Sequence, residues 1–131
     1  MGRIMPYNSE ELKEKGLGIL IVDDESHIRF LVGEALKGEG RTIHLAASGR
    51  QAIALLEQVA VDIVFLDLKM PGLNGLDVFK LLQQQGFAGK VVLMTANGEG
   101  DLLEEAKSLG LKKFLIKPFD LAELNQIIEG K

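Results

Sequence analysis

Five polar residues stand where apolar stretches of the sequence end. Asp23 and Asp24 directly follow one apolar run, Asp67 ends a second, Thr95 ends a third and Lys117 ends a fourth. Short apolar runs of this kind, bounded by turn residues, are typical of strands buried in a parallel sheet. The carboxyl ends of parallel strands share one edge of the sheet, so we expect these five side chains to meet there.

The chemistry available to these side chains follows from their charges. Three carboxylates at one edge repel one another, and each pKa would rise unless a cation were bound beside them. The sequence has no cysteine and no suitable pair of histidines, so oxygen atoms would be the ligands, and a few carboxylates with several waters suit Mg²⁺ best. Such an ion neutralises charge during phosphoryl transfer, for which Asp67 is a candidate nucleophile. Thr95 and Lys117 offer a hydroxyl and a positive charge to phosphoryl oxygens.

Each of these residues also has an ordinary structural interpretation. Asp23 and Asp24 could be acids at the start of a helix, stabilised by the helix macrodipole. Asp67 could be a turn residue, Lys117 a solvated strand end, and Thr95 suits any strand. The joint placement of all five at one predicted edge favours the chemical interpretation.

The segments around these residues predict five strands that alternate with five helices. One strand ends at Asp67, and the others cover residues 18–22, 42–46, 90–95 and 113–117. Apolar residues recur at helical spacing between the strands, starting at residues 26, 49, 76, 102 and 121. The alternation predicts an α/β fold with a doubly wound parallel sheet and helices on both faces. Gly33 interrupts the first helix at a cost of roughly 1 kcal/mol relative to alanine, which only close packing would explain.

Composition and charge narrow the class of protein. The 131 residues are 47% hydrophobic and 26% charged, which predicts a globular domain over residues 17–131 after an N-terminal tail, residues 1–16. The tail could hold a short helix from Ser9 to Lys15. The lack of cysteine excludes disulfide and thiolate sites and suits the cytoplasm, where we expect the protein. No apolar run is long enough to span a membrane, and a net charge of -4 argues against a nucleic-acid surface.

The ordered motifs resemble the receiver domain of bacterial two-component response regulators over about residues 18–129. The resemblance rests on four segments: Ile21-Val22-Asp23-Asp24-Glu25, Leu66-Asp67 with Met70-Pro71-Gly72-Leu73-Asn74-Gly75, Thr95-Ala96, and Lys117-Pro118-Phe119. It implies a flavodoxin-like sheet of strand order 2-1-3-4-5 that takes a phosphoryl group from a phosphohistidine. Within the family, Lys69-Met70-Pro71 and Lys117-Pro118-Phe119-Asp120 resemble the single-domain sporulation phosphorelay intermediate and the receivers of enhancer-binding transcription activators.

Carried over residue by residue, the resemblance assigns roles at the predicted site. Asp67 would be the phosphoacceptor, Asp24 and Asp67 would bind Mg²⁺ directly, and Asp23 would bind it through water. The backbone carbonyl of Lys69 would complete the metal site, and Lys117 would bind a phosphoryl oxygen.

The resemblance also implies a conformational switch. The Thr95 hydroxyl would move toward the phosphoryl group while the ring of Phe114 turns inward behind it, and the Lys117–Pro118 bond would be cis. Two positions depart from the family pattern: Asn74 stands where aspartate is commoner, and Phe114 lacks the hydroxyl of the tyrosine found in many relatives.

Partner proteins are a further implication of the resemblance. A histidine kinase or histidine phosphotransfer protein would supply the phosphoryl group and a downstream protein would receive the signal, with the chain a monomer or weak dimer that contacts neither nucleic acid nor membrane. Phe30 falls off the apolar stripe of its helix, so it is either exposed for docking of a histidine-bearing helix or packed under the last helix. Glu99 belongs to an acidic run that is typical of a solvated helix start.

Three alternatives stay open. The chain could be a receiver detached from a longer transcription regulator. An aspartyl-phosphate hydrolase would need a second acid two residues after the nucleophile, where the sequence has Lys69. A flavin or nucleotide binder would need a glycine- or hydroxyl-rich loop after the first strand, where two aspartates stand. We therefore expect a receiver that catalyses its own phosphorylation and dephosphorylation but is not an enzyme on external substrates.

Overall fold

The computed structural model describes Ile4 and residues 16–130. The helix predicted from Ser9 to Lys15 lies outside these residues. Within the described part of the chain, five strands alternate with five helices, as predicted. The strands are β1 (Leu17–Val22), β2 (Arg41–Ala46), β3 (Ile63–Asp67), β4 (Lys90–Thr95) and β5 (Lys113–Ile116). The helices are α2 (Ser26–Leu36), α3 (Gly49–Leu56), α4 (Gly75–Gln84), α5 (Gly100–Ser108) and α6 (Leu121–Ile128).

The five strands form one parallel sheet of order β2-β1-β3-β4-β5, which confirms the predicted fold. The register of the strands places the predicted site residues at similar heights along the sheet. Val22 pairs with Leu66, so the residues that follow them, Asp23 and Asp67, come at the same height of the sheet. Thr95 pairs with Ile116 in β5, directly before Lys117.

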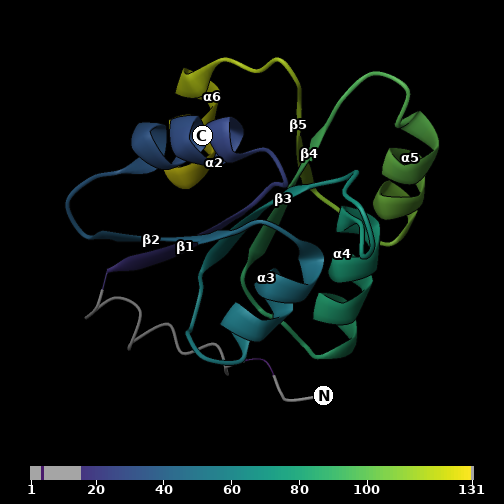
Figure 1. Cartoon of the computed structure of the whole chain (residues 1–131), viewed down its shortest axis with the longest axis horizontal. Coiled ribbons are helices and arrows are strands. Elements are labelled where there is room, and N and C mark those ends of the chain that lie inside the picture. The colour runs from purple at the N-terminus through teal and green to yellow at the C-terminus, as the bar shows by residue number, and fades with distance from the viewer. Residues whose placement is uncertain (1–3, 5–15, 131) are drawn as a thin grey trace.

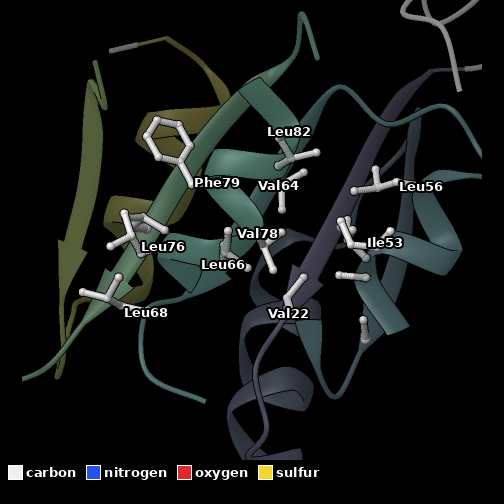
Figure 2. Packing of buried hydrophobic residues seen from close by; sticks show 14 of the residues in the cluster. Val22, Ile53, Leu56, Val64, Leu66, Leu68, Leu76, Val78, Phe79 and Leu82 are labelled. Carbon is white, nitrogen blue, oxygen red and sulfur yellow. The ribbon is translucent and has the colours of Figure 1, made fainter. Parts of the chain in front are cut away.

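Helices cover both faces of the sheet, and each face has its own hydrophobic core (Figure 1). Residues of α3, α4 and α5 pack on one face, while α2 and α6 pack on the other. Figure 2 shows part of the first core, in which Val64, Leu66 and Leu68 lie against residues of α3 and α4. Ile63 and Phe65 belong to the second core, as the alternation of side chains along a strand requires.

This alternation sets the side of the sheet on which each polar residue begins. Ile63 and Phe65 point toward α2 and α6, so Asp67, two residues further on, points the same way. Thr95 follows Val91 and Leu93, which pack on the α3, α4 and α5 side. Asp67 and Thr95 therefore lie at the same edge of the sheet, with their side chains starting on opposite faces.

Gly33 lies in the middle of α2, and its surroundings do not explain it. A Cβ at this position would meet the Cδ1 atom of Ile21 at 3.8 Å, and its next contacts would be with Ile43 and Leu45 at 3.9 Å. These distances are ordinary van der Waals contacts, so the prediction that close packing requires this glycine is wrong. No helix in the described part of the chain is long and apolar enough to cross a membrane.

Candidate functional site

Three aspartates gather at the carboxyl ends of β1 and β3. Asp23, Asp24 and Asp67 each offer a carboxylate oxygen, and these atoms all lie within 4.8 Å of one another. Asp23 is fully buried and Asp67 is 5% exposed, whereas Asp24 is exposed. Oxygen atoms at such spacing form a set of ligands that fits a hard divalent cation.

Lys117 joins two of these aspartates. Its ammonium group donates to Asp23 Oδ2 at 2.9 Å and to Asp67 Oδ1 at 3.1 Å. The backbone N–H of Lys117 donates to the carbonyl oxygen of Thr95 at 2.6 Å, and the Lys117–Pro118 peptide bond is cis, as predicted. The lysine predicted from the end of the fifth strand therefore lies in direct contact with the acidic cluster.

The single positive charge of Lys117 does not balance the negative charge of the three aspartates. Burial raises the pKa of Asp67 to about 7; the charge of Asp23 adds to this effect, while Lys117 opposes it. Burial lowers the pKa of Lys117, but the hydrogen bonds and charges of Asp23 and Asp67 outweigh it, so that pKa is raised overall. One ammonium group shared between two buried carboxylates therefore leaves Asp67 partly protonated near neutral pH.

Asp23 is fixed by its neighbours in the chain and in the sheet. Its Oδ1 accepts the backbone N–H of Glu25 at 2.9 Å, and its own N–H donates to the carbonyl oxygen of Ala46 at 3.1 Å. The guanidinium of Arg29 in α2 donates to the carbonyl oxygen of Asp23 at 2.6 Å. Sequence reasoning missed Arg29, because an arginine in the first turns of a helix gives no periodic signal that marks a contact with the preceding loop.

The loop after Asp67 is held against the end of β3. The backbone N–H of Gly75 donates to the carbonyl oxygen of Leu68 at 2.8 Å. A Cβ at Gly75 would collide with the carbonyl oxygen of Asp67 and lie 2.8 Å from the Cα atom of Leu68. Glycine is thus required where α4 begins, and the loop that carries Lys69 is anchored at both ends.

Asn74 is the N-cap residue of α4, and its contacts account for one departure from the pattern of receiver domains. Its side chain accepts the backbone N–H of Asp77 at 2.9 Å, and the Asp77 carboxylate accepts the N–H of Asn74 at 3.1 Å. This reciprocal pair is a capping box, an arrangement that satisfies two otherwise free backbone donors of a helix. Asparagine does this as well as aspartate.

Thr95 and Phe114 share the other face of the sheet. Phe114 packs against the core beneath α3, α4 and α5, and it stands two residues before Ile116, the partner of Thr95. Thr95 is 4% exposed, and its hydroxyl donates to the Glu99 carboxylate at 3.1 Å. The ammonium group of Lys107 in α5 lies 4.7 Å from the centre of the Phe114 ring. The two predicted switch residues therefore lie along the same helix, α5, with Thr95 at its N-terminal end and Phe114 near its other end.

Comparison with known proteins decides the family. The sequence model of the response regulator receiver domain matches residues 19–129, which is most of the chain. The chain belongs to the response regulator receiver domain family.

Relatives of this receiver confirm the assignment. It is 38% identical to sporulation initiation phosphotransferase F of Bacillus subtilis over 85% of this chain and 90% of that protein. It is also 38% identical to the regulatory protein AtoC of Escherichia coli, but there it spans 24% of the relative. A crystal structure of a receiver domain protein from Clostridium thermocellum matches with a TM-score of 0.80 and 27% identity, covering 87% of this chain and 92% of that one.

Two further outcomes concern residues around the site of this receiver. Phe30 is 64% exposed, so of the two predictions for it the structure supports exposure and rules out packing beneath α6. Glu99 is half-buried and accepts hydrogen bonds from Thr95 and Ala96, so its interpretation as part of a solvated helix start is wrong. Because the segment holds several acidic residues, its sequence did not show that the Glu99 side chain turns back toward Thr95.

Proposed function

We propose that Asp67 accepts a phosphoryl group from a phosphohistidine and that the resulting aspartyl phosphate switches the surface of the receiver. The family assignment places the chain in two-component signalling. The observation that carries the assignment to Asp67 is its contact with Lys117, at 3.1 Å, within the cluster of three aspartates. Asp67 is the member of that cluster that ends a strand and also contacts the Lys117 ammonium group.

The proposed reaction is a nucleophilic displacement at phosphorus. A carboxylate oxygen of Asp67 forms the new bond to phosphorus while the bond between phosphorus and the histidine nitrogen breaks. The electron pair of that bond stays on the imidazole, whose other ring nitrogen carries a proton, so histidine leaves as the neutral ring. Lys117 binds an oxygen of the phosphoryl group and offsets its negative charge.

The acidic cluster fits Mg²⁺ by the chemistry of its donors. We propose that Asp24 and Asp67 bind the ion directly, that Asp23 binds it through water, and that the backbone carbonyl of Lys69 completes the protein ligands. When bound, Mg²⁺ supplies positive charge that keeps Asp67 ionised and neutralises the transferred group. The raised pKa of Asp67 agrees with this fit, because burial and, after it, the charge of Asp23 disfavour the ionised carboxylate, and a bound cation would offset both.

We propose that Thr95 and Phe114 report phosphorylation to the surface. The hydroxyl of Thr95 would turn to a phosphoryl oxygen, and the half-buried ring of Phe114 would move inward on the same face of the sheet. Their position beneath α5 makes that helix, β5 and α6 the surface that a downstream protein would recognise.

An exposed apolar surface beside the site suits the phosphoryl donor. Phe30 and Leu31 of α2 are 64% and 46% exposed, and Ile116 and Leu121, at the end of β5 and the start of α6, are 56% and 43% exposed. Helices α2 and α6 pack on the same face of the sheet (Figure 1). We propose that a histidine-bearing helix of a histidine kinase or phosphotransfer protein docks there.

The remaining features of the proposal concern assembly and turnover. We propose a monomer or weak dimer in the cytoplasm, made of an N-terminal tail, residues 1–16, and a receiver, residues 17–131, without direct contact with nucleic acid or membrane. We also propose that the chain is not a turnover enzyme, since Lys69 stands where a hydrolase would need an acid. A detached receiver of a longer regulator would have the same site.

Phosphotransfer profiling tests this function. The chain is incubated with Mg²⁺ and a panel of phosphorylated histidine kinases and phosphotransfer proteins, with Asp67→Asn as the matched control. We expect a subset of donors to lose phosphate rapidly to the parent and not to the variant. Equal acceptance by Asp67→Asn would contradict the assignment to Asp67. A Phe30→Ala variant should accept phosphate more slowly from the protein donor but at the parental rate from a small phosphodonor.

A further inference from the structure

Glu99 makes two hydrogen bonds with the chain that precedes α5. One carboxylate oxygen of Glu99 accepts the hydroxyl of Thr95 at 3.1 Å and the backbone N–H of Ala96 at 3.1 Å. Glu99 is the N-cap residue of α5, yet its side chain accepts no hydrogen bond from the first turn of that helix. A side chain at this position usually does so. The carboxylate is therefore directed back toward Thr95.

The hydroxyl of Thr95 can serve one strong acceptor at a time, because it has a single hydrogen. In this structure the nearer acceptor is Glu99, at 3.1 Å, and the carbonyl oxygen of Ala96 lies further away at 3.4 Å. A hydroxyl that donates to Glu99 does not donate to a phosphoryl oxygen on Asp67. Hydrogen bonds to a charged acceptor are also stronger than those between neutral groups.

We propose that Glu99 is a positioning residue that retains the Thr95 hydroxyl in the unphosphorylated protein and so opposes phosphorylation. The proposal rests on the function proposed above for Asp67 and Thr95. Phosphorylation must break the bond between Thr95 and Glu99 before Thr95 can reach the phosphoryl group. Glu99 thereby sets how far the equilibrium favours the inactive arrangement.

Helix α5 connects the bond between Thr95 and Glu99 with the other switch residue, Phe114. Its N-cap, Glu99, contacts Thr95, and Lys107, near its other end, lies 4.7 Å from the centre of the Phe114 ring. Leu103 and Ala106 on the same helix are buried in the core that Phe114 also contacts. The two switch residues therefore contact opposite ends of α5, and loss of the Glu99 contact frees the N-terminal end of the helix.

The test measures how tightly the receiver binds a phosphoryl mimic. Beryllium fluoride with Mg²⁺ forms a phosphoryl-like group on an aspartate, and fluorine NMR titration reports its affinity in a chain without tryptophan. Glu99→Ala removes the acceptor and should raise the affinity about tenfold, the lower end of what is expected for a lost hydrogen bond to a charged group. Glu99→Gln keeps a neutral acceptor and should raise it about twofold.

Two controls separate this role from a general effect of charge. Asp101→Asn removes an exposed negative charge in the first turn of the same helix and should leave the affinity unchanged. In a Thr95→Val background, Glu99→Ala should have no effect, because the group on which Glu99 acts is gone. Circular dichroism confirms that each variant is folded.

A spectroscopic readout follows the contact itself. The backbone N–H of Ala96 donates to Glu99, so its amide proton signal should shift when the parent binds the mimic and should already be shifted in Glu99→Ala. An unchanged affinity in Glu99→Ala, or the same increase in the Thr95→Val background, would overturn the proposal. A parent that binds no mimic at all would instead contradict the proposed function of Asp67.

Discussion

Lys117 Nζ lies 3.1 Å from Asp67 Oδ1, although the two residues are 50 positions apart in the sequence. The contact exists because β3, β4 and β5 are parallel neighbours and both residues come at their carboxyl ends. The same ammonium group lies 2.9 Å from Asp23. Its positive charge therefore reduces the repulsion between the carboxylates of Asp23 and Asp67.

Replacing Lys117 should therefore slow phosphorylation far more than it impairs folding. We expect Lys117→Met to reduce the rate of phosphorylation by a small phosphodonor about 100-fold, the scale for losing one donor that stabilises charge in a transition state. Lys117→Arg keeps the charge and should lose less. Stopped-flow or quenched-flow phosphorylation in saturating Mg²⁺ gives both rates. Parental rates in Lys117→Met would show that Lys117 does not contact the transferred group.

The raised pKa of Asp67 predicts how stability depends on pH in the absence of metal. Its pKa is about 7 in the folded protein and 3.8 in an unfolded chain, so the folded state binds more protons between these values. The free energy of unfolding therefore falls as pH rises through this range.

Asp67→Asn removes that dependence. In EDTA the variant should have a higher Tm than the parent at about pH 8, and the difference should vanish near pH 4. Saturating Mg²⁺ should stabilise the parent more than the variant, because the ion binds the folded carboxylate. Thermal unfolding followed by circular dichroism measures both effects. A Tm difference that does not change with pH would place the pKa of Asp67 near its ordinary value.

Metal binding should release a proton from the same carboxyl group. Mg²⁺ affinity is expected to fall by up to about tenfold per pH unit below about pH 7, because the ion competes with the proton on Asp67. Calorimetric titration in two buffers of different ionisation enthalpy counts the protons released. If the affinity is the same at about pH 5.5 and about pH 8, this account of the cluster is wrong.

Two glycines should respond in opposite ways to alanine. Gly33→Ala should stabilise the receiver by about 0.5 to 1 kcal/mol, since a Cβ meets only ordinary contacts and alanine favours the helix. Gly75→Ala should destabilise it by about 1 to 3 kcal/mol through its collision with the end of β3. Urea unfolding of both variants provides the comparison. A destabilised Gly33→Ala would show that this glycine has a packing role after all.

The extent to which sequence predicted this protein depends on the kind of interaction. The boundaries of β4 could be predicted, because its run of apolar residues marks them. The order of the strands came from the resemblance to receiver domains, and the structure confirms it. Asp67 and Lys117 could be predicted at one edge of the sheet, because the carboxyl ends of parallel strands lie there.

The contacts that sequence reasoning missed depend on the loops that connect the strands and helices. Glu99 looked like one acid among several, and nothing in its spacing shows that its side chain turns back to Thr95. The close approach of Gly75 to Asp67 depends on the path of the loop between them. Such contacts depend on the three-dimensional course of irregular backbone, which has no periodicity to detect.

The central claim is that Asp67 is the phosphoacceptor. Intact-mass spectrometry after incubation with a small phosphodonor and Mg²⁺ tests it most directly, with Asp67→Asn treated in parallel. We predict that the parent gains the mass of one phosphoryl group, that mild base removes it, and that Asp67→Asn gains none. The same gain in Asp67→Asn, or no gain in a folded, Mg²⁺-binding parent, would contradict the account.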